Sequence, residues 1–383
     1  MQHSDDNAGP PAQAHPQGPL FRALGLMSGT SMDGIDVAEI ETDGRDRIRR
    51  GTSRTYPYDQ GFRHQLAEAI ALARDVADRA ARPGRLREIE AAITERHADA
   101  VVRFLAETNR DPAHIDLIGF HGQTVLHRPD LKLTLQLGDG AALARAVAIP
   151  VAWDMRANDV VAGGQGAPLA PAYHRAMAGA AGTKPIAILN IGGVANVTWI
   201  GADGEMIAFD TGPGNALLDD WMAKTVGVTR DEGGAAALAG RSHEDVVAFF
   251  LNHAYFAARP PKSLDRNAFF WDLVTGLSVE DGAATLVAMT VGSVRRALDH
   301  LPVPPVRWIV TGGGRHNAAT MLGLAAALGV PVDPAEAIGF DGDAVEAEAW
   351  AYLAVRCKLG LPLSYPGTTG VPEPTLGGRI DRP

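Results

Sequence analysis

The sequence contains very little of several features that define large classes of proteins. It has one cysteine, Cys357, among 383 residues, which excludes an internal disulfide framework and a cysteine-rich zinc site. No apolar run approaches the roughly 20 residues that a membrane-spanning helix needs, and the chain does not open on a basic region followed by an apolar stretch. We therefore expect a cytoplasmic protein without a membrane partner, in which Cys357 packs as a small hydrophobic residue.

Positive charge is also scarce. The formal net charge is -10, so the surface lacks a basic field that could hold a phosphate polymer, and we do not expect a nucleic-acid partner. Residues 1–19 contain almost nothing that can enter a core, which predicts a disordered tail.

Several well-known site motifs are missing. The chain has neither a GxxxxGK[ST] sequence nor a strand followed by GxGxxG that opens a helix, which disfavours P-loop NTPases and Rossmann domains. It also lacks GxSxG and HExxH, which lowers the expectation of a serine hydrolase or a zinc peptidase.

Glycine, in contrast, is abundant at 43 residues, and the length favours two domains. Two similar hairpins are predicted, at Leu24–Ile40 and at Ile186–Ile200, each an apolar run, a turn of small polar residues and a second apolar run. Apolar residues at helical spacing predict helices at Phe62–Ala81 and Arg85–Thr108. Two related α/β halves are therefore expected.

The chain is accordingly divided into four parts. Further helices are predicted at 216–224, 244–258, 283–301 and 343–359, and further strands at 115–120 and 306–310. We predict a tail over 1–19, a first domain over 20–182, a second domain over 183–342, and a C-terminal helix and segment over 343–383 that returns to the first domain.

Four glycine-containing loops follow predicted strands. The turn Ser28–Gly34 combines hydroxyls with glycines that let backbone amides approach an anion, and Asp33 and Asp36 are candidates to hold Mg²⁺ through water. The alternative is a tight hairpin that satisfies its own backbone. Three more loops, 192–193, 211–215 and 312–314, also follow strands, and together the four favour a nucleotide cleft.

Two carboxylates stand out, each with a competing interpretation. Asp210 ends an apolar run and enters the loop TGPGN, where it can act as a general base or form an Asx turn that stabilises the bend. Glu346 lies three residues after Asp343 at a predicted helix start, which is typical of a capping box. Lone histidines such as His174 and His316 are expected to be structural.

A further set of polar residues follows the strand at 115–120 and the apolar run near residue 150. Their side chains can orient sugar hydroxyls or simply connect loops. They are His121, Gln123, Thr124, Asp154, Arg156 and Asp159.

With these segments in hand, the chain resembles the 1,6-anhydro-N-acetylmuramic acid kinases, which belong to the actin-like and hexokinase-like ATPase superfamily. The resemblance runs from about Leu24 to Pro383. It depends on the motifs GLMSGTSMDGIDVA (25–38), FHGQT (120–124), GGQGAPLAP (163–171), NIGGVANVT (190–198), FDTGPGN (209–215), TGGG (311–314) and the GG at 377.

The resemblance implies a two-domain actin-like fold, related to ribonuclease H, with duplicated mixed sheets and an interdomain cleft. It implies that Asp210 is the catalytic base and that Glu346 contacts the sugar. ATP and Mg²⁺ are the implied cofactors, with Asp33 as the metal residue. The predicted ATP-binding residues are Gly29, Thr30, Ser31, Met32, Asp33, Gly34, Ile35, Asp36, Gly192, Gly193, Asn196, Gly312, Gly313, Gly314 and Asn317. The predicted substrate-binding residues are Glu346, His121, Gln123, Thr124 and Asp154.

The implied reaction opens the 1,6-anhydro ring by water attack and phosphorylates O6, giving N-acetylmuramic acid 6-phosphate and ADP in peptidoglycan recycling. One segment departs from the family pattern: Lys262–Arg266 is KSLDR, where relatives often have Lys-Ser-Thr-Gly-Arg. Two alternatives stay open, a kinase of the same superfamily for another sugar and a non-catalytic actin-like nucleotide switch. The sequence does not fix the oligomeric state, and a homodimer is one option.

Overall fold

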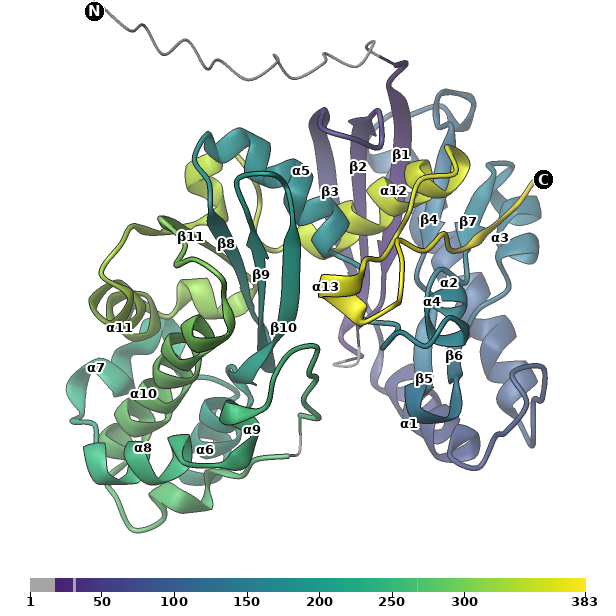
Figure 1. Ribbon diagram of the computed structural model, residues 1–383. Helices are drawn as coiled ribbons and strands as arrows, with labels where there is room; N and C mark the ends of the chain where they lie inside the picture. Colours follow the sequence, from purple (N-terminus) through teal and green to yellow (C-terminus); the bar gives the residue numbers. More distant parts are fainter. Residues whose placement is uncertain (1–17, 30–31, 267) are drawn as a thin grey trace, which may run out of the picture.

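A computed structural model describes residues 18–29, 32–266 and 268–383, which form two mixed sheets and a two-stranded ribbon (Figure 1). The first sheet contains β1 (Phe21–Met27), β2 (Gly34–Thr42), β3 (Ile48–Pro57), β4 (Leu117–Phe120), β7 (Val151–Trp153) and β13 (Arg379–Asp381). The second contains β8 (Ile186–Ile191), β9 (Val194–Ile200), β10 (Met206–Pro213), β11 (Arg307–Thr311) and β12 (Val332–Pro334). The ribbon is β5 (Gln123–Arg128) and β6 (Leu133–Leu137).

The two sheets share one topology over five strands, and the first sheet has β13 as an additional edge strand. The first runs β13-β7-β4-β1-β2-β3 and the second β12-β11-β8-β9-β10. The strands β1, β2 and β3 form an antiparallel meander, as do β8, β9 and β10. On the other side of β1, strands β4 and β7 follow in parallel, and on the other side of β8, strands β11 and β12 do the same. Both predicted hairpins are confirmed, and the repeated order is the duplicated, ribonuclease H-like arrangement expected of the actin-like fold.

Thirteen α-helices connect the strands within the described residues. Their bounds are Gln60–Ala73 (α1), Leu86–Glu107 (α2), Gly140–Val147 (α3), Ala157–Val161 (α4), Pro171–Ala181 (α5), Ala216–Val226 (α6), Ala235–Ala239 (α7), Glu244–Leu251 (α8), Ala254–Ala257 (α9), Val279–Ala297 (α10), Ala318–Leu328 (α11), Val345–Lys358 (α12) and Pro366–Thr369 (α13).

Three of the predicted helix spans are wrong at an end or in the middle. The helix from Phe62 stops at Ala73 instead of Ala81, and farther along Asp78 accepts a hydrogen bond from the Ala80 amide in a separate turn. The span 244–258 divides into α8 and α9, since the His253 side chain caps a new helix by accepting from the Tyr255 amide. The span 283–301 begins earlier, at Val279, where Ser278 provides the N-cap.

Among the residues that the structure describes, the hydrophobic core has three parts. One lies between the first sheet and α1, α2 and α3, and another lies between the second sheet and α6, α10 and α11. The third lies between the two sheets and is built mainly from α5 and α12, which is why these helices occupy the middle of the molecule in Figure 1. The partly buried Cys357 packs against this third part, in keeping with its predicted apolar role.

Helix α12 lies directly on the backbone of the first sheet. Gly25 of β1 and Gly119 of β4 are register partners, and both face α12. A Cβ at Gly25 would lie 1.7 Å from the Ala347 carbonyl oxygen, and one at Gly119 would lie 2.0 Å from that of Trp350. Only glycine permits this approach, which fixes the position of Glu346 and Trp350 on the helix.

The chain after α12 reaches the first sheet again. Strand β13 pairs antiparallel with β7, and α13 packs near β10 of the second sheet. Across the described ranges, none of the helices combines the length and apolar character that crossing a bilayer requires. The predictions for the tail up to residue 17 and for Thr30 and Ser31 lie outside the described residues.

Candidate functional site

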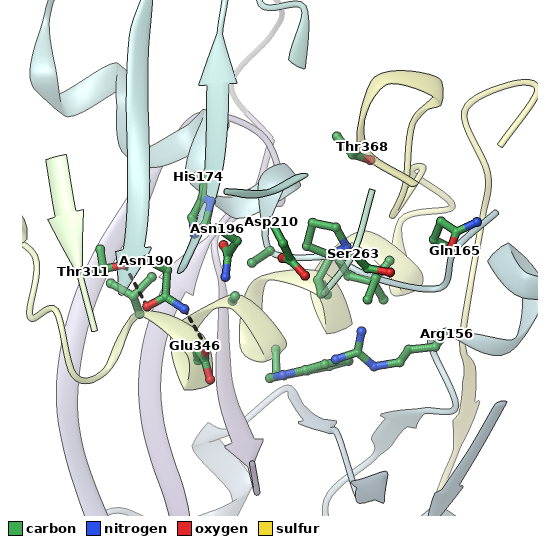
Figure 2. A pocket seen from close by; sticks show the side chains of 18 of the residues that line it. Arg156, Gln165, His174, Asn190, Asn196, Asp210, Ser263, Thr311, Glu346 and Thr368 are labelled. Carbon is green, nitrogen blue, oxygen red and sulfur yellow. Dashed lines mark hydrogen bonds between the residues drawn. The ribbon is translucent and has the colours of Figure 1, made fainter. Parts of the chain in front are cut away.

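A cavity lies between the two sheets and is lined by residues from both (Figure 2). The second sheet contributes a row of polar side chains across four neighbouring strands. Thr311 pairs with Asn190, Asn190 with Asn196, and Asn196 with Asp210 in the strand register, and all four line the cavity. Cross-strand partners project from the same face of a sheet, so this register alone gathers the four groups, which we call the polar row.

Asp210 ends the polar row on the edge strand β10. Its amide donates to the Lys262 carbonyl at 3.1 Å, and its Oδ2 accepts from the Leu264 amide at 2.7 Å. The Tyr255 hydroxyl donates to its carbonyl at 2.6 Å. Burial raises the pKa of Asp210 from 3.8 to about 6, and the Leu264 hydrogen bond only partly opposes this. These contacts hold a carboxyl group in the cavity with a proton affinity suited to general-base catalysis near neutral pH.

The loop that departs from the family pattern is the one that holds Asp210. Lys262 lies over the rings of Phe209 and Tyr255 and donates to the Tyr255 carbonyl at 3.0 Å. Burial lowers the pKa of Lys262 to about 8. Because Leu264 binds Asp210 through its backbone amide, the replacement of a family threonine by leucine leaves that hydrogen bond in place.

Glu346 lies in the first turn of α12 and reaches the other end of the polar row. Asn190 donates to its Oε1 at 3.3 Å, and Thr311 donates to the Asn190 Oδ1 at 3.4 Å. The Glu346 side chain is accessible to water from the cavity, but protein atoms surround it on its other sides. The resulting loss of solvation, followed by the charge of the Asp36 carboxylate, raises the pKa of Glu346 above its ordinary value.

The capping-box interpretation of Glu346 is wrong. The helix begins at Val345 with Ala344 as its N-cap, so Glu346 does not occupy the position three residues after a cap. Asp343 is instead bound to the Arg315 guanidinium, with Nη1 at 2.6 Å from its Oδ1. This leaves Glu346 free to face the cavity (Figure 2).

The glycine loops of the second sheet meet at the carboxyl ends of β8 and β11. The Asn215 amide donates to the Gly192 carbonyl at 2.8 Å, and the Asn215 side chain donates to the Ile191 carbonyl at 3.2 Å. Gly312 has a left-handed φ of 73°, and a Cβ there would lie 2.4 Å from the Asn190 Oδ1. Gly313 and Gly314 continue this turn beside Asn215. Asn317 is buried and caps α11, since its Oδ1 accepts from the Thr320 amide at 3.0 Å.

The loop between β1 and β2 approaches from the first sheet. The Met32 amide donates to the Gly29 carbonyl at 3.2 Å, and Gly34, Ile35 and Asp36 begin β2. Burial, then the charges of Asp343 and Asp33, raise the pKa of Asp36. Asp33 itself is exposed and lies 3.5 Å from Arg63. No group of three or more His, Cys, Asp or Glu side chains able to hold a metal ion occurs in the part of the chain that the structure describes.

The four other predicted substrate residues do not line the cavity as described. His121 donates from Nδ1 to the Ser28 carbonyl, and Gln123 bonds the Ser28 hydroxyl and the Gly29 carbonyl, so both secure the loop after β1. Thr124 lies 3.4 Å from His121 Nε2. Asp154 forms an ion pair with Arg79, away from the cavity, which makes it a connection between loops.

The cavity also contains residues that the sequence pattern did not single out. Trp350 and Lys262 were hidden in an apolar helix and a variable loop, and His174 was expected to be structural. His174 does bond Thr198 within the protein, at 2.8 Å from Nδ1 to Oγ1, while the rest of its ring faces the cavity. Arg156 was noted only as a polar loop residue. Its position just before the GGQGAPLAP motif was the one available signal.

Comparison with known proteins gives a consistent result. The family model described as anhydro-N-acetylmuramic acid kinase matches residues 21–382. The chain is 54% identical over 374 residues to the protein of that name from Methylobacterium nodulans, covering 95% of this chain and 100% of that one. It is 53% identical over 364 residues to the one from Rhizorhabdus wittichii, covering 94% and 99%.

A solved structure of component A of (R)-2-hydroxyglutaryl-CoA dehydratase from Acidaminococcus fermentans aligns with a TM-score of 0.47 and 14% identity, covering 88% of this chain and 99% of that one. We draw no conclusion from that weak likeness, because the strand order already gives the fold. On the family match and the curated relatives, the chain belongs to the anhydro-N-acetylmuramic acid kinase family.

Proposed function

We propose that the chain is an ATP-dependent kinase that opens the 1,6-anhydro ring of anhydro-N-acetylmuramic acid and phosphorylates O6, giving N-acetylmuramic acid 6-phosphate and ADP. The observation that carries this proposal is the position of Asp210, a carboxyl group of raised pKa at one end of the polar row, inside a cavity bordered by glycine loops. The reaction belongs to the cytoplasmic recycling of cell-wall sugars.

Asp210 acts as the general base in this scheme. Its Oδ2 is held by the Leu264 amide, and no other hydrogen bond reaches either carboxyl oxygen among the described residues, so Oδ1 can accept a proton from water. The water oxygen bonds to the anomeric carbon as the bond from that carbon to O6 breaks. This is the device of an inverting glycosidase, in which a carboxylate activates water on the face opposite the leaving oxygen.

The released O6 then attacks the γ-phosphorus of ATP, and the bond to the β-phosphate oxygen breaks to give ADP. Such a transfer requires mainly positioning and electrostatic stabilisation. We assign the positioning of ATP to the loops at Gly29, Gly192 and Gly312–Gly314, where glycines leave backbone amides accessible. Glu346 and Asn190 are assigned to the sugar hydroxyls.

Mg²⁺ would supply charge neutralisation on the phosphates when it is bound. Asp36 fits this role better than the predicted Asp33, because its carboxylate is partly buried beside other acidic groups, whereas Asp33 faces solvent beside Arg63. A magnesium ion usually takes one or two carboxylates, several waters and the substrate phosphates, so a cluster of protein ligands is not required.

The test is ADP release by the purified protein with ATP and a panel of sugars. We expect turnover with anhydro-N-acetylmuramic acid. Turnover should be at least about tenfold lower with N-acetylglucosamine, glucose and other unbridged sugars, because these have no 1,6-anhydro bridge for the general base to open. Turnover with another sugar alone would support a different kinase of the superfamily. ATP binding without stimulation by any sugar would support a nucleotide switch.

A further inference from the structure

The short helix α13 contacts both segments that support Asp210. Near its start, Gly367 lies on the backbone of β10, where an added Cβ would be 2.1 Å from the Met206 carbonyl oxygen. At its end, Gly370 has a left-handed φ of 79°, and a Cβ there would be 2.9 Å from Pro261 Cγ. Met206 begins the strand that carries Asp210, and Pro261 precedes the loop that binds its side chain.

A buried carboxylate from a distant part of the chain binds the last residue of this helix. Asp159, on α4, is 2% exposed, and its Oδ2 accepts from the Thr369 hydroxyl at 2.6 Å. Its Oδ1 accepts from the Gly166 amide. The Gln165 amide donates to the Thr369 carbonyl at 2.7 Å. The side chain and the backbone of Thr369 are thus both bound by the segment 157–166, and α13 lies between α4 and β10 (Figure 1).

The glycine loop after α4 is shaped around Asp159. The Gly164 amide donates to the Asp159 carbonyl at 2.9 Å, and a Cβ at Gly164 would lie 2.3 Å from Asp159 Oδ1 and 2.5 Å from Val371 Cγ1. A buried carboxylate lowers stability unless it accepts hydrogen bonds, whereas an apolar side chain would fill the same space without that penalty. We therefore attribute the carboxylate to the two directed bonds that it forms, which fix Thr369 relative to Gly166.

This contact lies outside the cavity. Among the described residues that line the cavity, neither Asp159 nor Thr369 occurs, and both are buried. Neither side chain can touch a ligand there. Any effect of the pair on the reaction must therefore pass through α13.

The path from α13 to the general base is short. Gly370 lies against Pro261, and the next residue, Lys262, accepts the Asp210 amide at 3.1 Å through its carbonyl. Two residues farther on, the Leu264 amide donates to Asp210 Oδ2 at 2.7 Å. A shift of α13 would displace this loop and, with it, the hydrogen bonds that orient the carboxyl group.

We propose that α13, fixed by Asp159 through Thr369, is a support that keeps the Asp210 carboxyl group in its catalytic position. The inference rests on the proposed function, in which Asp210 is the general base. Asp159 and Thr369 are positioning residues, because they touch no reacting atom. A displacement of about 1 Å at a reacting group can cost about a hundredfold in rate, so a support outside the cavity can control turnover.

The test measures the kinetics of four proteins with ATP and 1,6-anhydro-N-acetylmuramic acid: the wild type, Thr369→Val, Thr369→Ser and Thr94→Val. Thr94 is the matched control, because it is also a buried threonine, and its hydroxyl joins α2 to the Asp139 amide at the start of α3. We expect Thr369→Val to lower kcat at least about tenfold and to change either KM less than about threefold. Thr369→Ser, which keeps the hydroxyl, should recover most of the loss, and Thr94→Val should show none.

The pH profile separates positioning from a general loss of structure. The Leu264 hydrogen bond lowers the pKa of Asp210 and so opposes the effect of burial. If the support is lost, the ionised carboxylate loses this donor, and the acid limb of kcat/KM should move to higher pH in Thr369→Val but not in Thr94→Val. Lys262 and Tyr255 also face Asp210, but burial lowers the pKa of Lys262 only to about 8 and raises that of Tyr255, so neither determines the acid limb.

A kcat of Thr369→Val close to that of the wild type would overturn the proposal. So would a reduced kcat with an acid limb that is unchanged or lies at lower pH. If Thr369→Val does not fold, Asp159→Asn replaces it, because the amide keeps the shape but removes the charge that strengthens both hydrogen bonds. This variant should show the same shift of the acid limb with a kcat at least about threefold lower, and wild-type values of both would refute the support.

If the wild type does not turn over the sugar, the proposed function fails, and hydrogen exchange then tests the support separately. In the segment 260–264 the first two residues are prolines, so the exchanging amides are those of Lys262, Ser263 and Leu264. The Leu264 amide should exchange about fivefold faster in Thr369→Val than in the wild type, the factor that corresponds to about one hydrogen bond, and at the wild-type rate in Thr94→Val. Equal exchange in all three proteins would refute the role of α13.

Discussion

At the scale of single residues, the account depends on what surrounds the Asp210 carboxyl group. We expect Asp210→Asn to retain the fold and the binding of ATP and sugar but to lose at least about a hundredfold in turnover, because the amide cannot accept the proton from water. The Leu264 hydrogen bond can be kept by the amide oxygen. Steady-state kinetics and calorimetry on the same preparation measure both effects, and turnover within a few-fold of wild type would identify Asp210 as a structural Asx residue.

The same carboxyl group should make stability depend on pH with an unusual sign. Its folded-state pKa of about 6 lies above the ordinary 3.8, so folding is disfavoured as the group ionises. The penalty is absent below about pH 3.8, grows as the pH rises, and is complete above about pH 6.

Asp210→Asn should therefore be more stable than the wild type at pH 8, by on the order of 2 kcal/mol after allowing for water in the cavity. At pH 4 the two proteins should differ little. Urea unfolding at both pH values measures the difference, and a variant that gains no stability at pH 8 would show that Asp210 is not buried in this way.

The predicted site residues divide into those that line the cavity and those that bond to other parts of the protein instead. Asp210, near the end of β10, and Glu346, in the first turn of α12, both line the cavity. Asp154 does not, because Arg79, 75 residues earlier, pairs with it. Such a partner has no signature in the local pattern.

At the scale of elements, the contact between α12 and the first sheet is the critical one, since α12 carries Glu346 and Trp350 into the cavity. Gly119→Ala should reduce stability by about 2 to 3 kcal/mol and disturb substrate binding, because the new methyl group would meet the Trp350 backbone. Thermal unfolding and KM measure the two effects.

Gly179→Ala in α5 is the matched control. That position is exposed, with nothing within 4 Å of the methyl group that alanine would add, so the change should stabilise the protein by up to about 1 kcal/mol. Equal effects of both substitutions would contradict the proposed close packing of α12.

Strand pairs and long helices were predictable because their signals are local: apolar runs joined by turn residues, or apolar residues at helical spacing. Helix ends were less predictable. His253 starts a new helix after α8 through a single hydrogen bond that composition does not reveal. The polar row was also not predicted, since it depends on the register of strands β8, β9, β10 and β11.

At the scale of the whole molecule, two copies of one strand order face each other across α5 and α12. Within each sheet, the parallel strand pairs bring together residues that lie far apart in the sequence. Asn190 and Thr311, for example, are more than 100 residues apart and are neighbours in the second sheet. The family resemblance indicated this arrangement, whereas the individual glycine loops only suggested a nucleotide site. The division at residues 182 and 342 stays a prediction.

The most direct measurement of the central claim is mass spectrometry of the products formed from ATP, Mg²⁺ and 1,6-anhydro-N-acetylmuramic acid in water enriched in ¹⁸O. The account predicts ADP and N-acetylmuramic acid 6-phosphate with one heavy oxygen, located at the anomeric hydroxyl, and none in the transferred phosphate. Heavy oxygen in released inorganic phosphate, with the anhydro sugar unchanged, would show simple ATP hydrolysis and contradict the account.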